Sequence, residues 1–151
     1  MRDGTVYATT ELNEHGYHNG MYKHKNHLGV EVSGCGKLTK IGDDFWAWYD
    51  LKNGVPKPGT KPWPKDDIRY FEGSKTQVRG HYAKFTIAQE KAMVGLVQYV
   101  KDRCPGFSID NVVGHDSCMA EMGWYGEKQD PGGSLSMSIE EFREYLKKVI
   151  V

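Results

Sequence analysis

A long helical pattern over residues 85–102 constrains the fold more than any other part of the sequence. Thr86 is followed three residues later by Gln89, which is the spacing of a capping box at a helix N-terminus. Four apolar residues then recur at helical spacing and are expected to share one face: Met93, Leu96, Val97 and Val100. The Cys-Pro-Gly run at residues 104–106 ends the pattern. The sequence therefore predicts one long helix that packs on a core.

A second capping box, made by Ser138 and Glu141, predicts another helix over the last residues. Its apolar residues are expected to point inward: Ile139, Phe142, Leu146 and Val149. Both helices are interpreted as core packing. The 151 residues contain no internal repeat and no linker, which favours a single domain over residues 1–151.

Short stretches of alternating apolar residues predict strands at residues 5–9, 28–32 and 107–113. An Asp-Gly pair in the turn at residues 2–5 suits a tight hairpin, but only Met1 precedes this turn. The chain is therefore expected to begin in the middle of a supersecondary unit. Its 18 glycines and its aromatic content of 12% are typical of a loop-rich α/β protein with many tight turns.

Charge, hydropathy and cysteine content exclude several classes of protein. Twenty basic residues balance twenty acidic ones, so no net field favours nucleic acid or an anionic membrane. No apolar run is long enough to span a bilayer, and the N-terminus lacks the apolar region of a signal peptide. Three cysteines without a Cys-x-x-Cys pair argue against a disulfide framework and fit a reducing compartment. Cys118 lies three residues after His115 and is either a metal ligand or a spectator thiol.

Residues 39–84 show no regular pattern, and so long an irregular connection is usually functional. The segment combines an aromatic cluster with four prolines: Phe45, Trp46, Trp48 and Tyr49, then Pro56, Pro58, Pro62 and Pro64. The aromatic side chains either form the wall of a binding cleft, where they can pack on sugar rings, or pin the loop to the body of the protein. Both interpretations stay open at the level of sequence.

The strongest candidate for chemistry is formed by His115 and by Lys128 with Asp130. His115 follows the strand predicted at residues 107–113, and the end of a strand is a common place for catalytic residues. An imidazole and a carboxylate are both good zinc ligands, and a nearby ammonium can offset negative charge in a transition state. A Pro-Gly pair fixes the turn after Asp130. The alternative is an ordinary polar surface loop.

Two further groups of polar residues allow a functional and a structural interpretation. Four histidines lie in or beside the glycine-containing loop at residues 11–26: His15, His18, His24 and His27. They either bind a metal or belong to a solvated loop. Glu31 lies on the strand predicted at residues 28–32, where a carboxylate is either used in catalysis or faces solvent.

Taken in order, several short motifs resemble the zinc-dependent N-acetylmuramoyl-L-alanine amidases. This family includes phage amidase-type lysozymes, bacterial anhydro-muropeptide amidases and peptidoglycan recognition proteins. The motifs lie at residues 3–6, 12–20, 26–32, 85–89, 114–115 and 128–132. The resemblance implies a mixed central β-sheet flanked by helices in a single catalytic domain. Residues 39–84 then look like an insertion.

The resemblance also assigns roles to individual residues. It makes His115 and Asp130 ligands of a zinc ion, and it makes Lys128 the residue that stabilises the oxyanion. It matches Glu31 to the general base, and it places His18 and Asn26 in the substrate cleft. Such a zinc ion keeps an open position for water and lowers the pKa of that water toward ~7. Glu31 would take a proton from the water and later donate it to the leaving amine.

The family takes its first zinc-binding histidine from a strand that would lie upstream of Met1. The chain therefore matches two zinc ligands, and we expect an upstream segment or a second chain to complete the site. A fragment, a split or mis-started gene and a decayed copy all fit this expectation. A loop histidine that substitutes is a further alternative.

The expected activity is hydrolysis of the amide bond between the lactyl group of N-acetylmuramic acid and L-alanine. The expected protein is a phage endolysin or a cell-wall amidase, made in the bacterial cytoplasm and acting on peptidoglycan. Two other functions stay open: a catalytically inactive peptidoglycan-binding module of the same fold, and a regulatory or structural phage protein.

Overall fold

The computed structural model describes residues 2–9, 11–12 and 27–150. The chain forms two compact units. The first unit comprises Met1–Ser33 and Thr86–Ser108, and the second comprises Gly34–Phe85 and Ile109–Val151. Both α-helices and β-strands are present, as the sequence predicts, and the described residues contain three α-helices and small sheets. No helix in this part of the chain is both long enough and apolar enough to cross a membrane.

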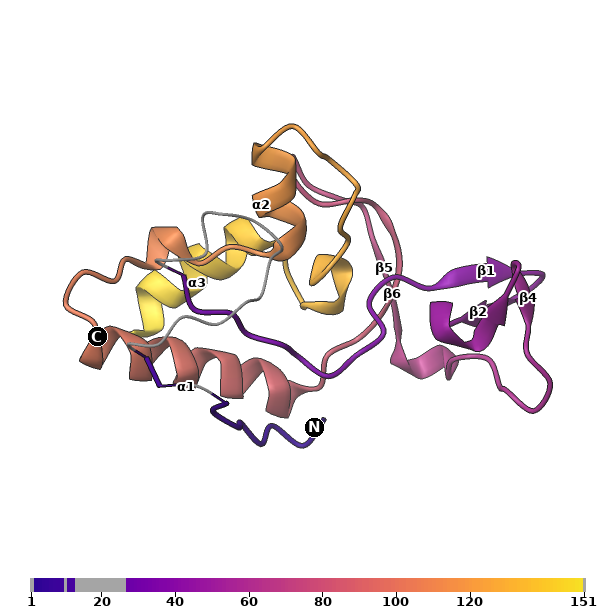
Figure 1. Cartoon of the computed structure of the whole chain (residues 1–151), viewed down its shortest axis with the longest axis horizontal. Coiled ribbons are helices and arrows are strands. Elements are labelled where there is room, and N and C mark those ends of the chain that lie inside the picture. The colour runs from indigo at the N-terminus through magenta and orange to yellow at the C-terminus, as the bar shows by residue number, and fades with distance from the viewer. Residues whose placement is uncertain (1, 10, 13–26, 151) are drawn as a thin grey trace. The chain divides into compact units, whose positions relative to one another are not determined.

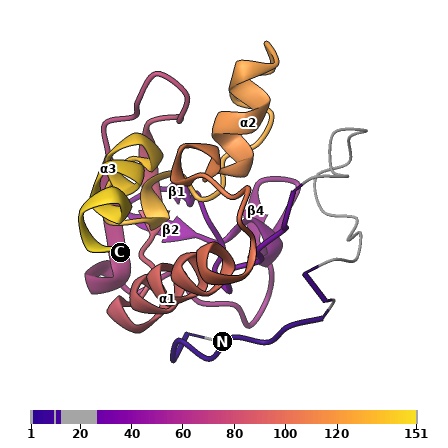
Figure 2. The ribbon, with the colours of Figure 1, turned by 90° about the vertical axis from the view of Figure 1, so that its left-hand side faces the viewer.

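Helix α1 (Ile87–Arg103) is the long helix of the first unit and runs as one continuous element (Figures 1 and 2). The predicted capping box is confirmed, because the Gln89 backbone N–H donates to Thr86 Oγ1 at 3.1 Å and the Thr86 N–H donates to Gln89 Oε1 at 2.9 Å. Gln89 is also buried and donates through Nε2 to the Ser33 carbonyl at 2.7 Å. Val100 is the buried member of the predicted apolar stripe. The same residues that begin the helix therefore also attach it to the N-terminal segment.

The strands predicted at residues 5–9 and 28–32 do not form. The Asp-Gly turn before the first of them is present, with a positive φ at Gly4. The apolar side chains of both stretches are largely exposed, as at Val6, Leu28 and Val30. Alternation marks a strand only when a neighbour accepts its backbone hydrogen bonds. The described residues provide no such neighbour for either stretch.

The second unit contains six short strands within residues 39–84, so the prediction of an irregular segment was wrong. They pair in sequence order as three antiparallel hairpins: β1 (Thr39–Ile41) with β2 (Asp44–Trp46), β3 (Leu51–Lys52) with β4 (Val55–Pro56), and β5 (Ile68–Phe71) with β6 (Gly80–Ala83). Asn53 and Gly54 join β3 to β4, and both have the positive φ that a two-residue hairpin turn requires. Figure 1 shows β1, β2 and β4 gathered in one part of this unit. The sheets of the described residues are these separate pairs.

A small apolar cluster packs the β1–β2 hairpin against the β5–β6 hairpin. Its buried members are Cys35, Leu38, Ala47 and Ala83, and its half-buried members are Phe45, Trp63 and Ile68. Trp63 carries the proline-rich loop into this cluster, and its backbone N–H donates to the Phe45 carbonyl at 2.7 Å. Some aromatic residues of the segment therefore pin it to the core. Trp48 does not, because its side chain is 68% exposed.

Helix α3 (Ile139–Val149) begins at the second predicted capping box, which is confirmed by reciprocal hydrogen bonds between Ser138 and Glu141. Three of its predicted inward residues are buried: Ile139, Phe142 and Leu146. Val149 was expected to be inward but is 42% exposed. The helix ends at Val149, and the extended residue Ile150 takes the buried position instead.

Candidate functional site

His115 is the first residue of a short helix, α2 (His115–Glu121), and does not lie at the end of a strand. The strand predicted at residues 107–113 is replaced by a 3-10 turn, η4 (Ile109–Asn111), between irregular residues. Gly114 is the N-cap residue, and its N–H donates to the Ser117 hydroxyl at 2.9 Å. A hydroxyl three residues after the N-cap therefore orders the start of α2. The apolar pattern predicted a strand here, but such a pattern does not show whether a partner strand is present.

The structure brings together the two residues that the sequence singles out as zinc ligands. His115 Nδ1 lies 3.3 Å from Asp130 Oδ2, although the residues are 15 positions apart. The residue after His115 is also bonded to Asp130, because the Asp116 N–H donates to the Asp130 carbonyl at 2.9 Å. The imidazole is mostly buried, and the carboxylate is largely exposed. The pair therefore has one face in the protein and one face that a ligand can reach.

The distance between the two side chains fits shared metal coordination. A typical N–H···O hydrogen bond is about 2.7–3.2 Å long, so 3.3 Å is at the weak end of that interaction. Two ligands of a tetrahedral zinc with bonds of about 2.0–2.1 Å are about 3.3–3.4 Å apart. The chemistry of the donors and their spacing therefore suit a zinc ion.

The other imidazole nitrogen offers a second way to hold a metal. His115 Nε2 is buried and has no hydrogen-bond partner among the described residues. If Nδ1 donates to Asp130, the free lone pair of the ring is on Nε2, and Asp130 becomes the residue that orients the ring. Both arrangements use the same two residues. Within residues 2–9, 11–12 and 27–150, however, no three histidine, cysteine, aspartate or glutamate residues group as metal ligands. The described residues therefore offer at most two candidate ligands, whereas a catalytic zinc has three protein ligands.

Asp116, next to the candidate ligand, is a buried carboxylate that accepts three hydrogen bonds. Gln77 Nε2 and the Gly132 N–H both donate to Oδ2 at 2.9 Å, and the Ser117 N–H donates to Oδ1 at 2.7 Å. Burial raises the pKa of Asp116 to about 6, and the charge of Asp130 adds to this rise. The hydrogen bonds from Gln77, Gly132 and Ser117 act in the opposite direction. Asp116 is thus well satisfied by protein donors, and its role is structural.

The hydrogen bonds of Asp116 hold the candidate site in place. The bond from Gly132 ties the chain just after Asp130 to the first turn of α2, where His115 lies. Gln77, which is fully buried, extends the connection to α3, because its Oε1 accepts from the Ile139 N–H at 2.8 Å. Neither Asp116 nor Gln77 was predicted from the sequence as a supporting residue. An acidic residue in the first turn of a helix is a usable signal for Asp116, whereas nothing in the sequence marks Gln77.

The loop after Asp130 packs so closely on the β5–β6 hairpin that only glycine fits. This loop contains the 3-10 turn η5 (Gly132–Ser134). A Cβ atom on Gly132 would overlap the ring of Tyr82, and one on Gly133 would overlap Phe71. Tyr82 itself is fully buried, and its hydroxyl donates to the Val78 carbonyl at 2.6 Å. The glycines therefore set how closely the loop approaches the hairpin.

The other predicted site residues lie in different parts of the chain. Lys128 is exposed on the same loop as Asp130. Glu31 is exposed and belongs to the first unit, whereas His115 and Asp130 belong to the second. His18 and Asn26 lie outside the described residues, as do His15 and His24. Cys118 is half-buried on α2.

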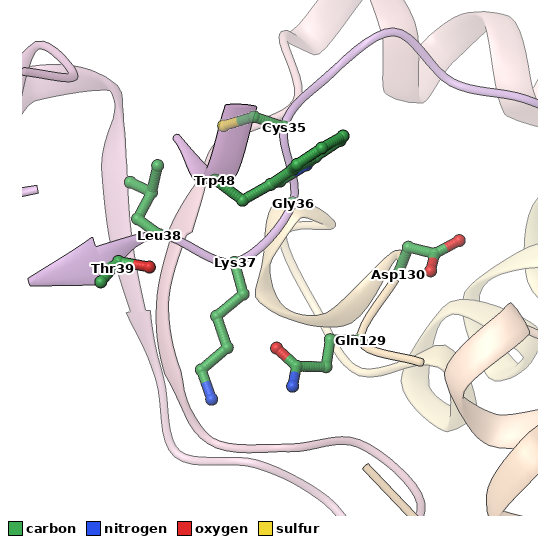
Figure 3. Close-up of a pocket in the computed structure, with 8 residues that line it drawn as sticks. All are labelled: Cys35, Gly36, Lys37, Leu38, Thr39, Trp48, Gln129 and Asp130. Carbon is green, nitrogen blue, oxygen red and sulfur yellow. The ribbon is translucent and has the colours of Figure 1, made fainter. Parts of the chain in front are cut away.

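An open hollow of about 430 Å³ lies beside Asp130 in the second unit (Figure 3). Its lining residues are Cys35, Gly36, Lys37, Leu38, Thr39, Trp48, Gln129 and Asp130. The lining joins the segment before β1, the exposed Trp48 and the loop that carries the candidate ligand. The sequence left open whether the aromatic residues of the segment at residues 39–84 form a cleft wall or pin the segment to the core, and Trp48 is the aromatic residue among them that lines the hollow.

Known proteins offer no direct guide to the function of this site. In comparisons with family models, curated proteins and solved structures, none matches the chain. Support for a function therefore comes from the His115–Asp130 pair, from the hollow beside it and from the order of the sequence motifs.

Proposed function

We propose that this chain is a zinc-dependent peptidoglycan amidase that cleaves the bond between N-acetylmuramic acid and L-alanine. The observation that carries the proposal is the 3.3 Å separation of His115 Nδ1 and Asp130 Oδ2. The two residues occupy the ligand positions of the family that the motifs resemble. The hydrogen bonds of the buried Asp116 carboxylate hold the segments that carry them in place. An amidase-like fold and action on the cell wall are part of the same proposal.

The residues of the chain have distinct parts in this chemistry. A bound zinc supplies an activated water at neutral pH and polarises the carbonyl group of the substrate. His115 and Asp130 hold the metal, and Asp116 keeps them together. The Lys128 ammonium offsets the charge that develops on the carbonyl oxygen. The family resemblance makes Glu31 the candidate for the general base.

The third protein ligand is expected from outside the described residues. Within this chain the candidates are His15, His18 and His24, and an upstream segment or a second chain is the alternative source. A site with two protein ligands holds zinc far more weakly than one with three. Metal analysis after dialysis distinguishes the two sources, because one tightly bound zinc per chain requires a third ligand from this chain.

The experiment that tests the proposal measures free amino ends released from purified sacculi. Release should be abolished by a chelator and restored by zinc. Asp130→Ala should abolish release, whereas the control Asp43→Ala should not, because Asp43 is exposed in the turn between β1 and β2. Release that persists in the chelator, or in the Asp130→Ala variant, would refute the proposal.

A second function is a non-catalytic peptidoglycan-binding module. The observation that favours it is the presence of only two candidate zinc ligands among the described residues. This function predicts binding to sacculi that a chelator does not change, with no release of amino ends. The same sacculus preparation therefore separates the two functions.

A further inference from the structure

The backbone of Trp48 has a fixed position, whereas its indole ring is exposed. It begins the 3-10 turn η2 (Trp48–Asp50), directly after Ala47, which is 1% exposed and belongs to the apolar cluster. The Trp48 ring meets Tyr49 edge to face, with centroids 5.5 Å apart. Its side chain nevertheless remains 68% exposed. A large aromatic ring in this situation is positioned by its backbone and still offers a flat surface to a ligand.

The hollow beside Trp48 has polar groups on its other sides. Figure 3 shows the Lys37 ammonium and the Gln129 amide on one side of the hollow, with the indole ring across from them. The Lys37 backbone is anchored by a bridge to the buried Tyr82. Asp130 completes the lining. One flat apolar face and several hydrogen-bonding groups therefore surround the same space.

We propose that this hollow binds a pyranose ring of an N-acetylhexosamine from the glycan strand. The C–H face of such a ring stacks on the indole of Trp48, while its hydroxyl and acetamido groups bond to Gln129 and Lys37. The volume of about 430 Å³ lies within the range of about 300–1,000 Å³ that is usual for small-ligand sites. The choice of sugar rests on the proposed function, and it specifies which part of the substrate this surface recognises.

The charges of the lining favour a neutral sugar over other ligands. Lys37 and Asp130 carry opposite charges, so the hollow has no excess of positive charge for a polyanion. Its mixture of apolar and polar groups also differs from the apolar groove that an amphipathic helix needs. Asp130 belongs both to the hollow and to the candidate zinc pair. A sugar in the hollow therefore lies next to the residue that is proposed to hold the metal.

The test is calorimetric titration of the chelator-treated chain with chitotetraose, a peptide-free oligosaccharide of N-acetylglucosamine. Trp48→Ala should raise the Kd about 2- to 13-fold, which corresponds to a loss of about 0.5–1.5 kcal/mol of stacking on the aromatic ring. Trp48→Phe should retain much of the affinity. The control is Trp124→Ala, because Trp124 is 49% exposed but does not line the hollow. Its Kd should stay unchanged, and thermal unfolding verifies that each variant is folded.

Three outcomes would overturn the inference: no binding of chitotetraose at about 10 mM, equal affinity of the wild type and Trp48→Ala, or equal losses in Trp48→Ala and Trp124→Ala. Binding of a free stem peptide at Trp48 in place of the glycan would also overturn it. The titration contains no zinc and no scissile bond, so it is independent of amidase activity. Glycan binding without release of amino ends, even after zinc and an upstream segment that carries a zinc-binding histidine are added, would refute the amidase and leave the sugar site standing.

Discussion

Replacing Gln77 with methionine tests whether the buried network around Asp116 stabilises the second unit. Gln77 is fully buried, and its two side-chain hydrogen bonds go to Asp116 Oδ2 and to the Ile139 N–H. Methionine keeps the length and the unbranched shape of glutamine but can make neither bond. The variant therefore removes the hydrogen bonds while it changes the packed volume little.

The expected loss of stability follows from the two groups that are left behind. The Asp116 carboxylate loses a donor, and a hydrogen bond to a charged group contributes about 1.5–3 kcal/mol. The Ile139 N–H, in the first turn of α3, loses its acceptor in the interior, which costs about 1–3 kcal/mol. Because the two effects share one side chain and the site relaxes, we expect a total of about 3–5 kcal/mol. That is a large part of the typical 5–15 kcal/mol for a whole domain.

Urea denaturation of the wild type and of Gln77→Met measures this difference, provided that the m-value stays constant. The matched control is Gln98→Met, because the hydrogen bond from Gln98 to Asp102 is exposed on the surface of α1. The control should change the free energy of unfolding by less than about 0.5 kcal/mol. A loss below about 1 kcal/mol in Gln77→Met would show that this network does not stabilise the fold.

Four further predictions concern the same unit and the long helix. Burial raises the pKa of Asp116 in the folded state to about 6 from 3.8, so the folded state binds the proton more tightly than the unfolded state. The contribution of Asp116 to stability should therefore fall by up to about 3 kcal/mol as the pH rises from about 4 to about 6. Denaturation at several pH values should show that Asp116→Asn lacks this decline, and an equal slope in both proteins would contradict it. In equilibrium dialysis, His115→Ala should weaken zinc binding. Asp130→Cys should retain zinc binding, because thiolate is an alternative zinc ligand. A folded Asp130→Cys variant that binds no zinc would count against Asp130 as a ligand. Lys128→Ala should retain zinc but lower amidase turnover by about 10²–10³, and unchanged turnover would remove Lys128 from the mechanism. Gly133→Ala should lower the free energy of unfolding by more than about 2 kcal/mol, because its Cβ would overlap Phe71 and Tyr82. The control Gly95→Ala, on an open surface of α1, should instead raise the free energy of unfolding by up to about 1 kcal/mol.

The starts of both long helices could be predicted from the sequence because capping is a local interaction. Thr86 with Gln89, and Ser138 with Glu141, satisfy N–H groups that lie within the same turn. No distant part of the chain is needed for these bonds. The apolar stripe of α3 was equally readable over Ile139, Phe142 and Leu146, and it failed only at Val149, where the helix ends.

Strands were predicted poorly because their hydrogen bonds come from another segment. Alternation at residues 5–9, 28–32 and 107–113 suggested strands that do not form, whereas six short strands lie in a segment without a clear pattern. Strands of two to four residues are too short to show a period. Hairpin turns such as Asn53-Gly54 were the local signal that marked them.

By itself the sequence determined which side chains are available for chemistry, and it singled out His115 and Asp130 through their residue types and their neighbours. Only the tertiary structure decided that these two lie 3.3 Å apart, that Asp116 and Gln77 hold them, and that Trp48 opens onto the hollow beside Asp130. The Gln77–Asp116 bond joins residues 39 positions apart, and no propensity or spacing encodes such a contact. The physical reason is that capping and turn formation depend on neighbours in the chain, whereas a buried polar site depends on how distant segments pack together.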